Sequence, residues 1–391
     1  MALTPPSRPA ELPDPSRCGP VIIGMSGGVD SAVGAWLLHR WGYPVQGLFM
    51  SNWQDDEDAY CTTAHDFQDA RRVCEAIGVP LHRVSFAAEY RQSVFAHFLD
   101  EYAAGRTPNP DVLCNREIKF GVCLDYARRL GGQWIATGHY ARVMHDPAGS
   151  RLMRATDGAK DQSYFLHGIT AAALSRCLFP IGTMLKPQVR ELAHSAGLPV
   201  FDKPDSTGIC FIGERPFADF LARYLRQARG PIETAAGEIV GEHRGLPFYT
   251  LGQRSGLKVG GRAGAAQAPW YVADKDNARN ALIVVQDQDH PRLLSQEFEV
   301  TELNWLGAAP RSGAHCQVKT RYRQRDLACR VHLEVAGKCR VELDVPARAV
   351  TPGQYAVFYA GDECLGGGVI ANRSALPFMP AGAALEYTRH I

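Results

Sequence analysis

Short apolar runs alternate with helical patterns from residue 20 to about residue 145. The apolar runs predict buried strands at 21–25, 45–50, 81–86 and 134–137. Between them, apolar side chains recur at three- and four-residue spacing, which predicts helices at 31–41, 62–77, 90–104 and 118–130. Alternating strands and helices favour a parallel sheet covered by helices on both faces. Ligands of such sheets bind at the carboxyl ends of the strands, so we expect a site there.

The pattern changes in the second half of the chain. Two more helices are predicted at 186–200 and 216–228. Glycines become dense from about residue 230, and short β-type runs follow at 298–303, 316–323, 328–335, 340–345, 355–359 and 367–370. The fold class expected is α/β plus β. The expected parts are a lead-in at 1–19, a parallel-sheet domain at 20–215, a small middle domain at 216–290 and an antiparallel β-barrel at 291–391.

Composition and charge exclude several classes of protein. The 391 residues suffice for two or three domains, and 46% hydrophobic with 21% charged residues is typical of a globular protein. A net charge of +1 excludes a uniformly basic nucleic-acid coat, so any nucleic-acid contact must come from a local patch. No run reaches the roughly 18 apolar residues of a membrane span, so no membrane association is expected.

The cysteines and the first residues bear on the compartment. The eleven cysteines form no C-x-x-C pair, which disfavours zinc-ribbon and thioredoxin-type sites, and no metal-binding residues are assigned. The proline-rich residues 1–19 lack the apolar core of a signal peptide. We therefore expect a disordered lead-in and a cytoplasmic protein.

A glycine-rich loop lies between the first predicted strand and the first helix. Its sequence is Ser26-Gly27-Gly28-Val29-Asp30-Ser31. The glycines allow the backbone to approach a ligand, and the free N–H groups of the following helix bind anions. The carboxylate in this loop suggests a bound Mg²⁺. The loop lacks the Walker A lysine and the G-x-G-x-x-G spacing, and an ordinary tight turn could use the same two glycines.

Two cysteines lie where polar loops meet apolar runs. Cys114 ends the segment TPNPDVLC, and a helix is predicted to begin near Arg116, so its thiol would lie at a helix N-terminus, where its pKa would be lowered. Asp111 precedes it by three residues and would lie on the same side of a helical turn. Cys210 lies in the segment STGICFIGE. Either cysteine could instead be a small buried core residue.

Basic residues alternate late in the chain. Lys319, Arg321, Arg323 and Arg325 would face one side of a strand, with Tyr322 on the other. Such a stripe favours a nucleic-acid surface, although a solvated sheet face has the same pattern. The acidic run at 55–58 is interpreted as a solvated loop, with Mg²⁺ binding as the alternative.

Eight motifs in order resemble one enzyme family. They are SGGVDS, TPNPDVLCNREIKF, ATGHYAR, KDQSYFL, STGICFIGE, YTLGQRSGL, KTRYRQ and GGGVI, and they extend from about residue 21 to about residue 371. The first alone resembles the PP-loop of N-type ATP pyrophosphatases, which belong to the adenine nucleotide alpha hydrolase-like fold. Together they resemble the bacterial tRNA-specific 2-thiouridylases, the MnmA/TrmU family.

The resemblance implies an activity and a mechanism. The family is a tRNA-uridine 2-sulfurtransferase that uses ATP to adenylate the C2 oxygen of the wobble uridine of tRNA, replaces that oxygen with sulfur, and releases AMP and pyrophosphate. Cys210 matches the cysteine that carries the sulfur as a persulfide, and Cys114 matches the nucleophile. The two would form a transient disulfide. Asp111 matches a catalytic carboxylate.

The resemblance also implies binding residues and partners. ATP would contact Gly24, Met25, Ser26, Gly27, Gly28, Val29, Asp30, Ser31, Met50 and Gly138. The target base would contact Asn109, Pro110 and Asp111, and the rest of the tRNA His139, Lys160, Asp161, Gln162, Arg321, Tyr322 and Gln354. The expected partners are the anticodon loop of a tRNA and a sulfur-relay donor protein, with ATP and Mg²⁺ as cofactors.

Two other functions fit part of the sequence. An ATP-pyrophosphatase amidotransferase or ligase would use the PP-loop but would not need Cys114 or Cys210. A non-catalytic RNA-binding or sulfur-carrier protein would release no pyrophosphate from ATP.

Overall fold

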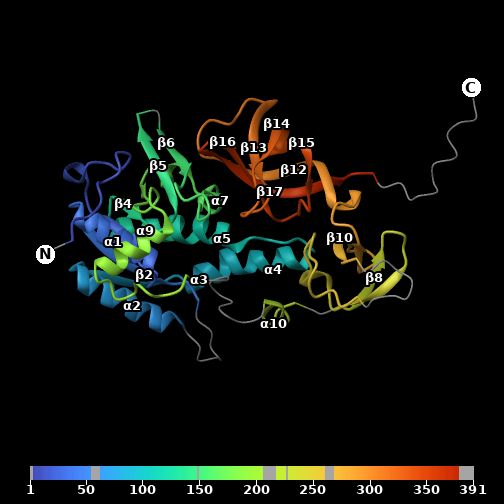
Figure 1. The fold of residues 1–391 in the computed structure, drawn as a ribbon, viewed down its shortest axis with the longest axis horizontal. Helices are drawn as coiled ribbons and strands as arrows, with labels where there is room; N and C mark the ends of the chain where they lie inside the picture. Colours follow the sequence, from blue (N-terminus) through green and yellow to red (C-terminus); the bar gives the residue numbers. More distant parts are fainter. Residues whose placement is uncertain are drawn as a thin grey trace, which may run out of the picture.

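The structure is a computed structural model, and it describes residues 3–53, 62–147, 149–205, 217–225, 228–259 and 268–377. Figure 1 shows a parallel-sheet domain at one end, drawn blue to green, and two β-rich parts at the other, with α4 extending from the first toward the β-rich parts. The predicted fold class, a PP-loop-type parallel-sheet domain with a middle domain and a C-terminal barrel, is confirmed. The bounds proposed for the three domains stay a prediction.

The first sheet is parallel and has the strand order β3-β2-β1-β4-β7. Its strands are β1 (Val21–Gly24), β2 (Val45–Ser51), β3 (Leu81–Ser85), β4 (Trp134–Ala136) and β7 (Cys177–Leu178). The helices α1 (Val29–Arg40), α2 (Thr62–Ile77) and α9 (Lys186–Ser195) belong to the same domain. All four predicted strands are confirmed. The fifth has only two residues, too few to give a period.

Helical segments carry the chain from β3 to β4 and beyond. They are α3 (Ala87–Tyr90), a π-helical stretch (Arg91–Phe95), α4 (Ala96–Ala103), α5 (Pro110–Leu113), a second π-helical stretch (Cys114–Val122), α6 (Cys123–Arg129), α7 (Ser163–Leu166), α8 (Ala171–Leu174) and α10 (Phe217–Leu221). The helix expected near Arg116 begins earlier, at Pro110, because Asn109 caps it: its side chain accepts a hydrogen bond from the N–H of Asp111. α10 is shorter than the predicted 216–228.

The middle part is a four-stranded sheet with the order β10-β11-β8-β9. Its strands are β8 (Gly230–Thr234), β9 (Ile239–His243), β10 (Tyr271–Asp276) and β11 (Ala281–Val285). β8 and β11 pair in parallel, and the other two pairs are antiparallel.

The C-terminal part is a closed antiparallel barrel. Its strands are β12 (Leu294–Trp305), β13 (Ala314–Lys319), β14 (Leu327–Leu333), β15 (Cys339–Arg348), β16 (Tyr355–Ala360) and β17 (Glu363–Ala375). Pairing of β12 with β17 closes the ring. A hairpin from the first domain, β5 (Ala141–Asp146) with β6 (Gly149–Arg154), extends this sheet, because Leu152 and Met153 pair with Cys364 and Glu363. No local pattern in the sequence predicts this hairpin.

The lead-in differs from the expected disordered segment. In residues 3–19, Leu12 is buried, the guanidinium of Arg40 donates to the carbonyl of Leu3 at 2.9 Å, and the indole of Trp41 donates to the carbonyl of Pro6 at 2.8 Å. Prolines lose little conformational entropy when they become ordered, so a few such contacts hold the segment against the first domain.

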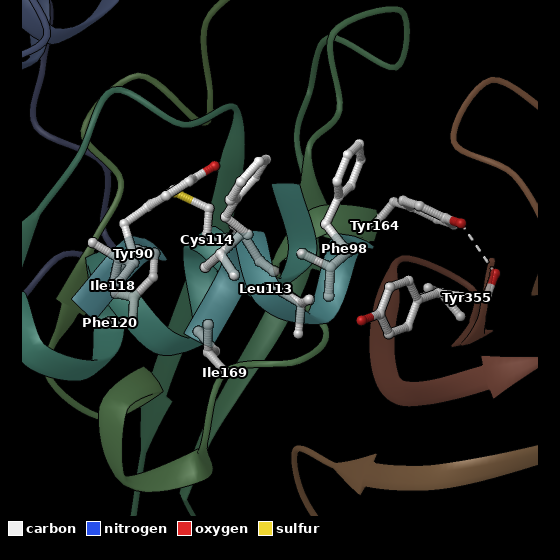
Figure 2. Packing of buried hydrophobic residues seen from close by; sticks show 14 of the residues in the cluster. Tyr90, Phe98, Leu113, Cys114, Ile118, Phe120, Tyr164, Ile169 and Tyr355 are labelled. Atoms are coloured by element: carbon white, nitrogen blue, oxygen red, sulfur yellow. Dashed lines mark hydrogen bonds between the residues drawn. The ribbon is translucent and has the colours of Figure 1, made fainter. Parts of the chain in front are cut away.

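The core continues from the helical segments into the barrel. Tyr164 and Tyr355 are both buried, and the hydroxyl of Tyr164 donates to the carbonyl of Tyr355 at 3.0 Å. Figure 2 shows this bond beside the cluster that contains Leu113 and Cys114. The segment that precedes Cys114 is therefore packed against two parts of the molecule.

Candidate active site

The PP-loop, residues 26–31, is held by its own hydrogen bonds. The hydroxyl of Ser31 donates to the carbonyl of Gly28 at 3.0 Å and lies 3.1 Å from the hydroxyl of Ser26. Gly27 has a φ of +75°, and a Cβ there would lie 2.4 Å from the carbonyl oxygen of Asp66. Only glycine fits this position. The loop ends at the N-terminus of α1, as the anion-binding prediction requires.

The other residues predicted to bind ATP gather at this loop. A Cβ on Gly138 would lie 2.7 Å from the backbone nitrogen of Ser31, so Gly138 packs directly on the loop backbone. A Cβ on Gly24 would lie 3.7 Å from the methyl group of Met50. The side chains of Met25 and Val29 are buried, so they could offer a ligand only their backbone groups.

A network of charged side chains lies beside the loop, and its central residue, Lys186, is not among the residues predicted from the sequence. The ammonium of Lys186 lies 2.7 and 2.8 Å from the two carboxylate oxygens of Asp30, which also accepts a bond from the hydroxyl of Tyr140 at 2.9 Å. A signal was present: Lys186 begins a helix, where a cation is unfavourable to the helix dipole and needs another reason to be there.

Asp205 joins this network from the chain that leads toward Cys210. Its carboxylate lies 2.8 Å from the ammonium groups of Lys160 and Lys186, and 2.6 Å from the guanidinium of Arg190. Burial alone would raise the pKa of Asp205, but the bonds from Lys160 and Lys186 lower it well below its usual range. Asp205 therefore stays ionised throughout the neutral range.

A second lysine, Lys203, contacts the backbone of the PP-loop. The ammonium of Lys203 donates to the carbonyl of Gly27 at 3.1 Å and lies 2.7 and 2.6 Å from the carboxylates of Asp66 and Asp69. Burial opposes its charge, but the two carboxylates raise the pKa of Lys203 above its usual value. Lys203 thus ties the PP-loop to α2.

The segment predicted to touch the target base is fixed from outside its own domain. The N–H of Thr107 donates to the carbonyl of Pro352 at 3.0 Å, and the side-chain amide of Gln354 donates to the carbonyl of Thr107 at 2.7 Å. Asn109, Pro110 and Asp111 follow directly, as the cap and first residues of α5. The C-terminal barrel therefore positions this segment.

Asp111 and His139 share the electrostatic influence of Lys119. Burial raises the pKa of Asp111, and Lys119 partly offsets this. Burial lowers the pKa of His139 well below its usual range, and Lys119 lowers it further. The imidazole Nδ1 of His139 lies 2.6 Å from the hydroxyl of Thr137. The site thus holds a carboxyl group with a raised pKa, that of Asp111, and an imidazole that stays neutral at neutral pH, that of His139.

Cys114 is buried, with 2% of its surface exposed. It belongs to the buried cluster that also contains Tyr90, Ile118 and Phe120 (Figure 2). Since α5 begins at Pro110, Cys114 lies in the second helical turn, so its expected position at a helix N-terminus is wrong. Cys210 and the acidic run at 55–58 lie outside the described residues, and so does the pairing predicted for the two cysteines.

Three residues predicted to contact tRNA make internal bonds. Lys160 pairs with Asp205, and the carboxylate of Asp161 is buried and accepts bonds from the backbone N–H groups of Ala155 and Ser163. The side chain of Gln162 accepts a bond from the N–H of Tyr140 at 2.9 Å. The bonds of Lys160 and Asp161 hold the turn before α7 in place, and the bond of Gln162 joins this turn to Tyr140, the residue after His139.

The predicted basic stripe is wrong. β13 ends at Lys319, and residues 320–326 form a turn, so Arg321, Arg323 and Arg325 do not alternate on a strand. The guanidinium of Arg321 donates to the carbonyl groups of Leu251 and Ala349, at 2.7 and 3.0 Å. Tyr322 packs against Phe165, with ring centroids 4.4 Å apart and the ring planes tilted by 45°. The alternation of basic residues did not suffice to predict a strand, because a turn can have the same sequence pattern.

The described part of the chain contains no group of three or more His, Cys, Asp or Glu side chains that could hold a metal ion by themselves. Within the same residues, no helix is long and apolar enough to cross a bilayer.

Comparison with known families covers most of the chain. Residues 19–214 match the family described as the tRNA methyl transferase HUP domain, residues 218–286 its PRC-barrel domain, and residues 295–370 the aminomethyltransferase beta-barrel domain.

Individual relatives are close and complete. The chain is 55% identical to the tRNA-specific 2-thiouridylase MnmA of Sodalis glossinidius over 91% of its own length and 97% of the relative's. It is 54% identical to the protein of the same name from Hahella chejuensis, over 90% and 96% of the two lengths. Among solved structures, the U34-tRNA thiolase NcsA from Methanococcus maripaludis is 20% identical over 49% of this chain and 60% of its own, with a TM-score of 0.32, which is too low to support an inference.

Proposed function

The chain belongs to the tRNA-specific 2-thiouridylase family, and we propose on this premise that it uses ATP to replace the C2 oxygen of the wobble uridine of tRNA with sulfur. Membership makes it a sulfurtransferase that thiolates a uridine of tRNA. The adenylation step, the persulfide route and the roles of single residues are parts of the proposal, as is a cytoplasmic location.

One observation carries the proposal. Gly138 packs on the backbone of the PP-loop, and the next residue, His139, shares the influence of Lys119 with Asp111. Two consecutive residues, Gly138 and His139, thus relate to the predicted nucleotide loop by packing and to the segment predicted to hold the base through the charge of Lys119. An ATP bound at the loop and a uridine held by residues 109–111 would be neighbours, as adenylation of the base requires.

In the first step, the C2 oxygen of the uridine attacks the α-phosphorus of ATP, and pyrophosphate leaves. The N-terminus of α1 and the hydroxyls of Ser26 and Ser31 bind the phosphates. Asp30 fits Mg²⁺, which typically takes one or two carboxylates together with substrate phosphates, and the ion would neutralise phosphate charge there. Asp111, with its raised pKa, serves as acid or base on the uridine.

In the second step, sulfur replaces the activated oxygen. Cys210 carries the sulfur as a persulfide received from a donor protein. The Cys114 thiolate attacks Sγ of Cys210 and forms a disulfide, and hydrosulfide leaves. Hydrosulfide attacks C2, the C2–O bond breaks, and AMP departs. A two-electron thiol reductant then restores both cysteines.

The tRNA-binding part of the proposal assigns the rim of the site. Lys160 and Gln162 lie on one turn, which contacts Asp205 and Tyr140, whereas His139 and Tyr322 come from two other segments. Asp161, Arg321 and Gln354 make internal bonds, so their effect on tRNA would come from holding the rim in place. A flipped wobble base could then enter beside residues 109–111.

A thiolation assay tests the proposal. Unmodified tRNA with a wobble uridine is incubated with ATP, Mg²⁺, a persulfide sulfur donor and a thiol reductant, without added sulfide, and the nucleosides are identified by mass spectrometry. We expect 2-thiouridine from the wild type, and little or none from Cys114→Ala and Cys210→Ala. A control variant, Cys74→Ala, removes a buried thiol on α2 and should keep the activity.

The alternative functions give different results. Pyrophosphate release with another acceptor, unaffected by loss of either cysteine, would favour an amidotransferase or ligase. Binding of tRNA with no release of pyrophosphate would favour a carrier or RNA-binding protein.

A further inference from the structure

Lys186 occupies an unusual place for a lysine. It is the first residue of α9, and its side chain is only 10% exposed. Its ammonium touches two carboxylates from distant parts of the chain, Asp30 of the PP-loop and Asp205. Burying an ammonium group and setting it at a helix N-terminus both cost free energy, so packing alone gives no reason for a lysine here.

The surroundings of Lys186 favour anions. The N-termini of α1 and α9 both approach this point, since Asp30 lies in the first turn of α1 and the N–H of Lys186 itself donates to the carboxylate of Asp157 at 2.9 Å. Helix N-termini attract negative charge. A phosphate group on the PP-loop would therefore lie within reach of a flexible side chain that carries a full positive charge.

Both present partners of Lys186 can lose it without being left unpaired. Asp205 would keep Lys160 and Arg190, and Asp30 would keep the hydroxyl of Tyr140. Lys203, the other lysine at the loop, differs, because it holds the loop carbonyl of Gly27 and two carboxylates of α2. Unlike Lys203, Lys186 can thus exchange a protein carboxylate for a ligand without leaving its partners unpaired.

We propose that Lys186 binds the pyrophosphate portion of ATP, its ammonium exchanging the Asp30 carboxylate for phosphate oxygens. The inference rests on the proposed function and deepens it, since it assigns a residue to one part of the nucleotide. Asp30 holds the ammonium in place until the nucleotide arrives and is then released to face the phosphates and their counter-ion. Lys186 also stabilises pyrophosphate as it leaves.

Calorimetric titration with Mg²⁺-pyrophosphate and, separately, with AMP tests the assignment. In Lys186→Met we expect about 10- to 100-fold weaker binding of pyrophosphate, the effect of losing a charged hydrogen bond, and AMP binding within about 2-fold of wild type. Arg190→Met is the matched control: it removes a cation from the same carboxylate and the same helix but makes no contact with Asp30. It should bind both ligands as the wild type does.

Other outcomes overturn the inference or its premise separately. Equal weakening of pyrophosphate and AMP, or equal weakening by Arg190→Met, would show a structural role for the network and overturn the assignment, as would unchanged pyrophosphate binding in Lys186→Met. If Lys186→Met does not fold, Lys186→Gln, which keeps a donor between the carboxylates, gives the same comparison. A wild type that binds neither ligand would overturn the proposed ATP site itself.

Discussion

The side-chain amide of Gln354, in the C-terminal barrel, donates a hydrogen bond to the carbonyl of Thr107, two residues before Asn109, over a distance of 2.7 Å. The turn that carries Gln354 also accepts the N–H of Thr107 through Pro352. The segment expected to touch the base therefore depends on a domain more than 240 residues further along the chain. A residue can thus affect catalysis from the barrel without touching the nucleotide.

Replacement of Gln354 tests this dependence. Gln354→Ala leaves a carbonyl without its donor, so we expect a loss of about 1–2 kcal/mol in the free energy of unfolding. A misplaced 109–111 segment should slow thiolation at saturating tRNA by about 10-fold or more. Gln317→Ala, which removes another bond within the barrel, should leave the rate unchanged. Weaker tRNA binding with a normal maximal rate would show instead that Gln354 acts only by contacting tRNA.

Gly138 gives a steric prediction. A Cβ there would press on the backbone of Asp30 and Ser31, so Gly138→Ala should displace the PP-loop and weaken ATP binding by about 10-fold or more. Gly158→Ala is the control, because a Cβ at that glycine meets no atom within 4 Å and no left-handed φ is recorded for it. Equilibrium dialysis with ATP measures both. Equal affinities in the two variants would remove Gly138 from the nucleotide site.

Replacement of Asp111 should raise the stability of the folded protein and lower its thiolation activity. Burial raises its pKa in the folded state above the unfolded value of about 3.8, so the folded state loses stability as pH rises through this range and keeps that loss at neutral pH. Asp111→Asn should therefore unfold at higher urea than the wild type at pH 7, with a smaller difference near pH 4. Thiolation should fall by about 100-fold or more. A destabilised variant at pH 7 would contradict the burial argument.

The buried imidazole of His167 should make the folded protein less stable in acid. Burial lowers its pKa from 6.5 to about 4, and its Nδ1 lies 2.6 Å from the carbonyl of Tyr164. The unfolded chain takes up a proton below pH 6.5 while the folded chain does not until about pH 4, so stability falls across this window by up to about 3 kcal/mol. In His167→Asn, which keeps a donor, urea unfolding between pH 7 and pH 4.5 should show a shallower fall. If the free energy of unfolding falls equally with pH in the variant and the wild type, the assignment of this effect to His167 is wrong.

Local patterns predicted the parallel sheet well because its elements are made by neighbouring residues. The bounds of α2 matched the apolar spacing of 62–77, and β1 followed from one short β-branched run. The hairpin β5–β6 was not predicted because its exposed and buried positions depend on pairing with β17, which lies far along the chain. Non-local pairing leaves no local period to detect.

The site shows the same division. Motif resemblance pointed to Asp30 and Gly138, and the structure brings them into contact. It gave no hint of Lys186, although a lysine at the first position of a helix is an electrostatic mismatch that reasoning from charge could have found. The prediction for Arg321 was wrong because the alternation of basic residues was interpreted as a strand. In the structure, hydrogen bonds to three acceptors hold Arg321 in a turn.

The sharing of a sheet between the first domain and the barrel affects synthesis of the protein. On the ribosome, β6 is completed long before its partner residues Glu363 and Cys364 emerge, an interval on the order of ten seconds or more at about 5–20 residues per second. During that time the outer edge of β6 offers unpaired backbone groups to any other nascent strand. Truncated chains that end before β17 would keep this edge open permanently, so fragments of the first domain should aggregate more readily than the complete protein.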